Sequence, residues 1–225
     1  MELDFPTYSV LEAAHHLRVP KSTIRYWAAP PNPYSPLTVV EPASDTLPTL
    51  LSFLNLAELH VLSTLRRKHK LKMQSIREAI LYLSEEAESE IEKRHPLLSP
   101  GLQTDGTSLF LEIYGRLTNV SFGGQLAMQR MLNVALSRIS RDDYGLPIKI
   151  YPLARHYSID DAPTIVSIDP QRSWGRPVID GTGLATQIIG ERFNLGESIE
   201  DLVKDYDRPR REIEEAIRWE MPVAA

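Results

Sequence analysis

Two short amphipathic segments near the N-terminus, joined by a tight turn, constrain the fold of this chain more than any other feature. They read YSVLEAAHHLRVPKSTIRYW and span residues 8–27. Ser9 and Glu12 have the spacing of a capping box, so we expect the first helix to begin after Ser9. Pro20 suits the first turn of a second helix, where its missing N–H costs nothing. Ile24 and Trp27 then share one helix face and are predicted to pack into a core.

The outer face of the second segment is polar, basic and aromatic, which suits contacts to a phosphate backbone and to base edges. The alternative is that Ser22 and Thr23 only start the helix and that Tyr26 joins Trp27 in the core. A basic run at residues 66–70 is either a phosphate contact or a solvated helix end. The candidate DNA-binding residues are Arg18, Lys21, Ser22, Thr23, Arg25, Tyr26, Arg66 and Arg67.

Charge is distributed unevenly along the 225 residues, whose formal net charge is −5. Residues 1–84 carry a balance of +2, whereas residues 156–225 carry −6. DNA affinity rests largely on lysine and arginine side chains that neutralise phosphates, so any DNA contact is expected in the first third. The acidic last third suits a basic or metal-rich protein partner.

Composition excludes several classes of protein and site. The chain has no cysteine, which excludes disulfides, thiolate zinc sites and cysteine nucleophiles and agrees with a reducing cytoplasm. We find neither a signal peptide nor an apolar run long enough to cross a bilayer, so a soluble cytoplasmic protein is expected. The Asp180-Gly181-Thr182-Gly183 run lacks the rest of a nucleotide-binding fingerprint. No catalytic residue, metal site or cofactor is predicted.

Periodicity predicts the elements of the first two thirds. The proline-rich segment 28–48 is interpreted as a wing with a short hairpin around Leu37–Val40. His95-Pro96 is expected to end a helix that begins near Met73 and extends to Lys93. Residues 125–136 are either helical or extended. The remaining predictions are a helix over 56–69 and strands over 109–114, 117–122 and 148–151.

The last third is predicted to contain two short strands, at 164–168 and 176–179, followed by three helices. Those helices span 185–193, 198–206 and 209–220, with Ser198 as an N-cap and Pro209 in a first turn. They again suggest a helix-turn-helix bundle, although we find no convincing sequence repeat. The sequence therefore predicts an α+β chain in three domains: an N-terminal winged helix-turn-helix (1–94), a small central β-rich domain (95–155) and a C-terminal helical bundle (156–225).

The N-terminal pattern resembles a known family. VPKSTIRYW, a proline-rich wing and then LSFLNLAELHVLSTLRRKHKLKMQSIREAILYL are similar to the winged-helix DNA-binding domain of the MerR type over residues 7–84. In that family the second helix enters the major groove, and Thr23, Arg25 and Tyr26 match positions that touch DNA. The long dimerisation helix of that family is interrupted here at His95-Pro96.

The C-terminal pattern resembles a second family, a small domain of formally unknown function found in predicted VapB-like antitoxins. The matching residues are the Gly175–Ile179 run, Gly181-Thr182, Gly196 with Ser198, and the closing Glu215–Arg218 run. The resemblance implies a neighbouring toxin with a PIN-like ribonuclease fold. It also implies that this chain neutralises the toxin and binds operator DNA to repress its own operon.

Arginines at the last helix fit such a partner, because a PIN-type site is a carboxylate cluster that holds divalent metal and an arginine can compete with that metal. The alternative is that these arginines pair with Glu212, Glu214 and Glu215 on a solvated helix face, and that Trp219 belongs to the core. The candidate toxin-binding residues are Arg208, Arg210, Arg211, Arg218, Trp219 and Met221.

Three functional hypotheses follow. The first is a type II antitoxin that binds a PIN-like ribonuclease toxin and operator DNA, as a homodimer or a toxin–antitoxin hetero-oligomer. The second is a stand-alone MerR-like transcriptional regulator whose C-terminal region senses a small ligand. The third, a hydrolytic enzyme with a helical accessory domain, has no supporting motif.

Overall fold

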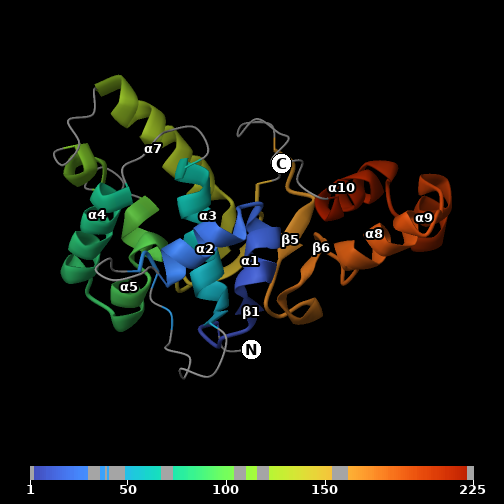
Figure 1. Cartoon of the computed structure of the whole chain (residues 1–225), viewed down its shortest axis with the longest axis horizontal. Helices are drawn as coiled ribbons and strands as arrows, with labels where there is room; N and C mark the ends of the chain where they lie inside the picture. The colour runs from blue at the N-terminus through green and yellow to red at the C-terminus, as the bar shows by residue number, and fades with distance from the viewer. Residues whose placement is uncertain are drawn as a thin grey trace. The chain divides into compact units, whose positions relative to one another are not determined.

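The computed structural model describes residues 3–29, 36–38, 40, 49–66, 73–103, 110–115, 122–153 and 162–221. The chain divides into two compact units, residues 2–148 and residues 149–225 (Figure 1). Both units are built mainly from helices, with small antiparallel sheets. The predicted mixed α+β class is therefore confirmed. No helix in the described part of the chain is long and apolar enough to cross a membrane.

The first unit is built around helix α3 (Phe53–Arg66), which is buried on every side. All described side chains from Leu51 to Leu65 are buried. The helix predicted over 56–69 is confirmed over most of its length, and Leu56 and Leu65 are fully buried. Polar side chains of α3 are buried as well, and each of these requires an internal partner. His60 is one example, because its Nε2 lies 3.2 Å from the carbonyl oxygen of Ala135.

The other elements of the first unit pack around α3. Strand β1 (Tyr8–Ser9) pairs antiparallel with β2 (Leu50–Leu51), so that Tyr8 stands opposite Leu51. The remaining elements are α1 (Val10–Leu17), α2 (Lys21–Ala28), α4 (Met73–Glu86), α5 (Glu90–Arg94), two 3-10 turns (Pro96–Leu98 and Pro100–Gln103), α7 (Phe122–Ser137) and β3 (Ile139–Arg141).

The predicted continuous helix from Met73 to Lys93 is wrong. Helix α4 ends at Glu86, and α5 starts afresh after Ser89. Ser89 and Glu92 cap each other's backbone N–H groups, with Glu92 N donating to Ser89 Oγ at 3.2 Å. This capping box fixes a new helix start inside a segment of good helix formers. The predicted end of the helix at His95-Pro96 is confirmed.

The predicted strand over 109–114 is also wrong, because residues 110–115 are helical. Phe110, Leu111, Ile113 and Tyr114 are all buried, so the segment is covered on more than one side and its alternation carries no strand signal. Residues 122–137 form helix α7, which settles the open alternative for 125–136. The central β content is therefore limited, in the described part of residues 95–153, to β3 and β4 (Pro147–Ile150). The predicted wing and the 117–122 strand lie almost wholly outside the described residues.

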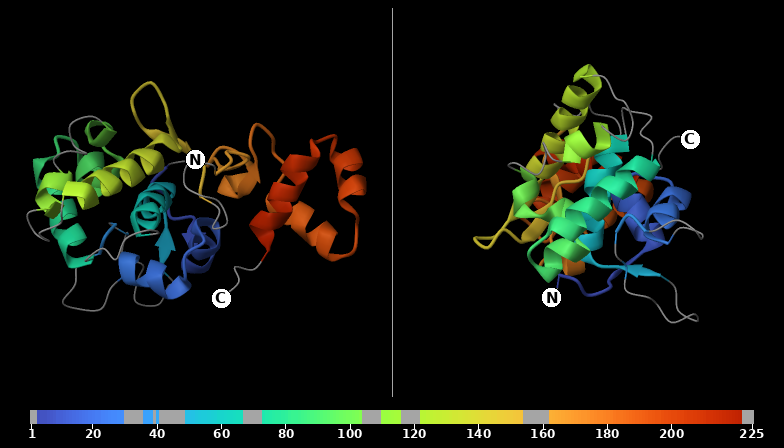
Figure 2. Two further views of the ribbon diagram at one scale, coloured as in Figure 1. Left: turned by 90° about the horizontal axis from the view of Figure 1, so that it is seen from above. Right: turned by 90° about the vertical axis from the view of Figure 1, so that its left-hand side faces the viewer.

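The second unit is a three-helix group beside a small antiparallel sheet. Ile150 of β4 pairs with Ile168 of β5 (Val166–Ile168), and β5 pairs with β6 (Pro177–Ile179). Helices α8 (Thr186–Asn194) and α10 (Arg210–Glu220) lie side by side, and α9 (Ile199–Tyr206) completes the group (Figures 1 and 2). The strands and helices predicted from residue 164 onward are confirmed to within two residues. The shared core contains Ile179, Ile189, Leu202, Ile213 and Ile217.

Candidate functional site

The turn between α1 and α2 is fixed by local chemistry at each step. Ser9 caps α1 as predicted, with Ser9 N donating to Glu12 Oε2 at 2.8 Å and Glu12 N to Ser9 Oγ at 3.1 Å. Arg18 ends α1 in the left-handed conformation, with φ of 53°. Pro20 then stands immediately before α2, in the position of its N-cap. The chain therefore leaves α1 and enters α2 with little freedom in the path between them.

Helix α2 separates a buried face from an exposed one. Ile24 and Trp27 are fully buried, which confirms their predicted core role. Lys21, Ser22 and Arg25 are exposed. These three polar side chains form the available surface of α2.

The other candidate DNA-binding residues differ in their access to solvent. Thr23 and Tyr26 are half-buried. Arg18 was expected on the same surface but is only 7 % exposed. The Arg66 side chain and Arg67 lie outside the described residues.

Tyr26 is held in place by a residue that sequence reasoning missed. The Arg77 guanidinium of α4 lies 4.7 Å from the centre of the Tyr26 ring, within the range of a cation–π contact. Arg77 Nη1 also donates to Tyr26 Oη at 3.4 Å. Arg77 is itself buried. These contacts give Tyr26 one orientation beside the exposed residues of α2.

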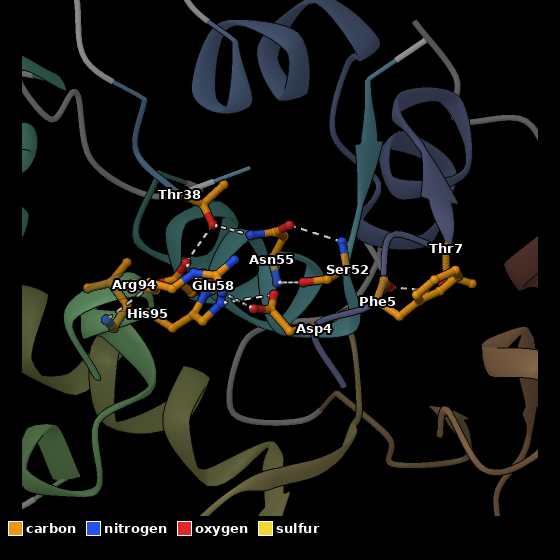
Figure 3. Close-up of polar contacts among 10 residues, drawn as sticks. Asp4, Phe5, Thr7, Thr38, Ser52, Asn55, Glu58, Arg94 and His95 are labelled. Carbon is orange, nitrogen blue, oxygen red and sulfur yellow. Dashed lines mark hydrogen bonds and ion pairs between the residues drawn. The ribbon is translucent and has the colours of Figure 1, made fainter. Parts of the chain in front are cut away.

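A buried carboxylate, Glu58 on α3, is the centre of a polar network (Figure 3). Its Oε2 accepts from the Thr38 hydroxyl and lies 3.0 Å from His95 Nδ1. Its Oε1 accepts from Leu97 N at 3.3 Å. Thr38 Oγ1 also accepts from Asn55 Nδ2 at 2.9 Å. Burying a carboxylate is costly unless its oxygens receive hydrogen bonds or a charge, and here they receive both.

His95 is enclosed between two carboxylates. Its second ring nitrogen, Nε2, lies 3.3 Å from Asp4 Oδ1, and Asp4 also forms a 2.8 Å ion pair with Arg94. Burial disfavours the charged imidazolium. The hydrogen bond to Glu58 and the negative charges of Glu58 and Asp4 outweigh burial, and together they raise the pKa of His95 above its ordinary value of 6.5. A protonated His95 thus donates to a carboxylate on each side.

The Glu58 network also reaches α2. Leu37 N donates to the carbonyl oxygen of Trp27, at the end of α2, at 2.7 Å. The next residue, Thr38, is the one whose hydroxyl meets Glu58. The network therefore ties the end of α2 to the buried helix α3. The contact pairs Glu58–His95 and Arg77–Tyr26 are 37 and 51 positions apart, so local spacing gave no signal for them.

The second unit contains a helix pair with nearly the same backbone as α1–α2. Ser198 caps α9, which has eight residues like α1, and Asp207 ends it in the left-handed conformation with φ of 49°. Pro209 precedes α10 with φ of −53° and ψ of 137°, the same values as Pro20. Each residue lies 189 positions after its counterpart, Ser9, Arg18 or Pro20. A structural repeat is therefore present where no sequence repeat was found.

The arginines beside α10 are mostly engaged within their own unit. Arg208 pairs with Glu212 at 2.7 Å, and Arg210 pairs with Glu200 and Glu214. Arg218 pairs with Glu214 at 3.2 Å and Glu215 at 3.0 Å. The alternative reading, in which these arginines pair with glutamates along the helix, therefore describes three of the four.

The other candidate partner residues of α10 differ in exposure. The Arg211 side chain is exposed and makes no hydrogen bond or ion pair with the described residues. Met221 is 48 % exposed. Trp219 is 1 % exposed and belongs to the core, the second of the two roles considered for it.

The Asp180-Gly181 run forms a turn after β6. Asp180 precedes Gly181, whose φ is 74°, and its carboxylate meets Lys149 Nζ at 3.0 Å and Tyr151 Oη at 3.1 Å. Burial opposes ionisation of Asp180, yet these hydrogen bonds and the Lys149 charge lower its pKa below the ordinary value. No group of three or more His, Asp or Glu side chains in the described ranges is arranged to hold a metal ion.

Comparisons with known proteins show which proteins this chain resembles. Residues 166–219 match a family described as "Protein of unknown function (DUF433)". A Mycobacterium tuberculosis protein named "Putative antitoxin VapB45" is 28 % identical over 227 residues, which covers 92 % of this chain and 90 % of that protein. Together they support an antitoxin-like protein. The crystal structure of Rv2018 from Mycobacterium tuberculosis shares the fold, with a TM-score of 0.72 and 24 % identity over 96 % of this chain and 100 % of that one.

Proposed function

We propose that the chain is the antitoxin of a type II toxin–antitoxin pair. It binds a PIN-like ribonuclease toxin through the second unit. It binds operator DNA through the α1–α2 pair, acting as a winged helix-turn-helix of the MerR type, and thereby represses its own operon. The observation that carries the proposal is the similarity to a protein named as an antitoxin over 92 % of the chain.

The proposed DNA contact uses the exposed face of α2. Lys21 and Arg25 supply charge to phosphates and base edges, and Ser22 supplies a hydroxyl donor. Tyr26 adds an oriented phenol, because Arg77 holds its ring. Proteins of this helix-turn-helix kind read two half-sites as dimers, so a dimer is part of the proposal.

The proposed toxin contact uses α10, and Arg211 is its central residue. A guanidinium inserted among carboxylates competes with the metal that those carboxylates hold. Arg208, Arg210 and Arg218 would each have to leave a carboxylate of their own unit first. Arg211 has no such contact to break and is exposed in the first turn of α10. Met221 extends this surface as an exposed apolar contact, whereas Trp219 supports α10 from the core.

Co-purification with the protein encoded by the neighbouring gene tests the proposal. A stable complex with a small nuclease-fold protein is expected, and its mass gives the stoichiometry. Its ribonuclease activity should be inhibited by the wild-type chain and recover when Arg211→Ala replaces it, whereas Arg218→Ala has a smaller effect. A chain that runs alone and leaves the nuclease active would refute the antitoxin proposal.

The runner-up is a stand-alone MerR-like regulator that senses a small ligand. One observation favours it, an apolar cavity of about 110 Å³ in the first unit, lined in part by Leu54, Ile91, Leu98 and Tyr144. Glu92 and Ser99 are polar groups in its wall, and Ser99 Oγ donates to Glu92 Oε1 at 3.1 Å. A thermal-shift survey of small apolar amines tests it, and filling the cavity with Ser99→Leu should abolish any shift found.

A further inference from the structure

The turn between β5 and β6 holds an exposed tryptophan in an unusual backbone conformation. Ser173 and Trp174 both adopt left-handed dihedrals, with φ of 46° and 59°. This region is uncommon for residues other than glycine and is a genuine outlier for a bulky side chain. Such outliers persist when the surrounding structure determines them, and they cluster at functional sites.

The surroundings do determine this turn. Gln171 N donates to Asp169 Oδ1 at 2.8 Å and Gly175 N to Arg172 O at 2.9 Å. Ser173 Oγ donates to Gly183 O at 2.8 Å, which ties the turn to the segment that leads into α8. The position of Trp174 is therefore set by the backbone around it.

Trp174 differs from the other two tryptophans of the chain. Trp27 and Trp219 are 0 % and 1 % exposed, whereas Trp174 is 80 % exposed. An indole that stays in water contributes no burial to the stability of its own unit, and the left-handed backbone opposes that stability. A large, rigid and exposed aromatic side chain is typical of the few residues that dominate a protein–protein interface.

The charges beside Trp174 indicate the kind of partner. The Arg176 side chain is exposed and forms no hydrogen bond or ion pair with any described residue. Arg172, two positions before the indole, is half exposed and lies 3.5 Å from Asp169 at its nearest contact. Two guanidinium groups beside an indole fit an acidic surface. A nucleic acid carries phosphate charge along its whole length and would be repelled by the net charge of −6 on residues 156–225, whereas a carboxylate beside an apolar pocket is a local contact.

We propose that the Asp169–Arg176 turn is a protein-docking site, at which Trp174 enters an apolar pocket and Arg176 pairs with a carboxylate of an acidic partner surface. The partner is the nuclease-fold toxin, so the inference rests on the proposed function in naming it. This contact is separate in chemistry from the proposed Arg211 contact, because it supplies affinity and leaves the metal-binding carboxylates untouched.

Titration calorimetry of the full chain with the purified nuclease-fold protein of the neighbouring gene tests the proposal. Trp174→Asn should weaken binding at least tenfold, and Arg176→Ala several-fold. Gln171→Ala, an exposed residue of the same turn, should leave the affinity unchanged. In the free chain acrylamide should quench Trp174 fluorescence, and the nuclease should protect it, as judged against Trp174→Asn.

If Trp174 had a structural role, its replacement would lower the melting temperature of the chain. Asparagine tolerates the left-handed region better than tryptophan, so Trp174→Asn should melt at the same temperature as the wild type or higher. Equal affinity of wild type and Trp174→Asn would overturn the docking site and leave the antitoxin proposal standing. Failure of the wild type itself to bind the nuclease would overturn both. Protection of the indole by single-stranded RNA, with none by the protein, would also overturn the docking site.

Discussion

The helix pairs α1–α2 and α9–α10 share their caps and the backbone conformation of their turn, and differ in the charges on their outer faces. Both begin at a capping serine, end the first helix in a left-handed residue and enter the second after a proline. Both bury an isoleucine at the same point, Ile24 or Ile213. Residues 9–28 contain three basic residues and one acidic residue, whereas residues 198–217 contain four basic and seven acidic residues. The caps, turn and core therefore fix the shape, while the outer face is free to suit a different partner.

The second pair also holds arginines in ion pairs with glutamates, whereas Arg25 of the first pair is exposed. Arg210 meets Glu200 and Glu214, and Glu214 occupies the position that corresponds to Arg25. Arg25 remains exposed on α2. A surface whose arginines are already paired is poorly suited to phosphates. This contrast supports the assignment of DNA to the first pair and of a protein partner to the second unit.

Replacement of the isoleucine at the matching buried position is expected to have the largest effect on stability. Ile24→Ala and Ile213→Ala should each lower the free energy of unfolding by about 2–5 kcal/mol, because both side chains are fully buried. Urea unfolding followed by near-UV circular dichroism measures both changes. A loss below about 1 kcal/mol at one of the two positions would show that the matching isoleucines contribute unequally to the cores of their units, and would contradict the comparison.

The exposed faces of α2 and α10 should contribute differently to the affinity for DNA. Arg25→Ala is expected to weaken operator affinity by about 1–3 kcal/mol, the range for one good base contact. Glu214→Ala, at the matching position of α10, should leave it unchanged. A gel-shift titration at fixed salt compares the two variants. Unchanged affinity for Arg25→Ala would remove α2 from the proposed interface.

The two helix caps should respond alike. Ser9→Ala and Ser198→Ala should each cost about 0.5–2 kcal/mol, because each hydroxyl accepts the backbone N–H three residues later at 3.1 Å. Thermal unfolding of each variant measures the loss. A loss of stability for one variant and none for the other would show that the two caps contribute unequally to stability despite their matching geometry.

A fall in stability from about pH 6 to about pH 8 is expected in the first unit, which contains His95. The folded pKa of His95 is raised, so its stabilising effect is complete below the unfolded value near 6.5 and is lost as pH rises through the folded value. The first unit should therefore be less stable at about pH 8 than at about pH 6. His95→Gln should flatten that slope in a urea titration. A wild-type slope of the opposite sign would contradict a protonated His95 between Glu58 and Asp4.

Sequence patterns predicted the elements that local chemistry defines. The first helix pair was predicted from Ser9 with Glu12, Pro20 and Trp27, and the second from Ser198 and Pro209. Residues 110–115 were misread, because a short segment buried on several sides shows no helical period. The end of α4 was misread because Ser89 interrupts a run of strong helix formers.

The interior of the candidate site could not be predicted in the same way. Glu58, His95 and Asp4 meet only through the tertiary fold, and no local spacing relates them. Arg77 reads as an ordinary residue of an amphipathic helix, although it supports Tyr26. The repeat of the helix pair was missed for a related reason. Its two copies agree mainly at a cap, a proline and a few apolar positions, and these are too few to stand out between segments offset by 189 positions.

The hydrogen bonds that link Trp27 through Leu37 and Thr38 to Glu58 have a consequence for genetics. A screen for mutants that no longer repress the operon should recover changes at Thr38 and Glu58 as well as at Arg25. Those interior alleles should be temperature-sensitive and regain repression on cooling, because they loosen the support of α2 and spare its surface. Alleles at Arg25 should fail at every temperature.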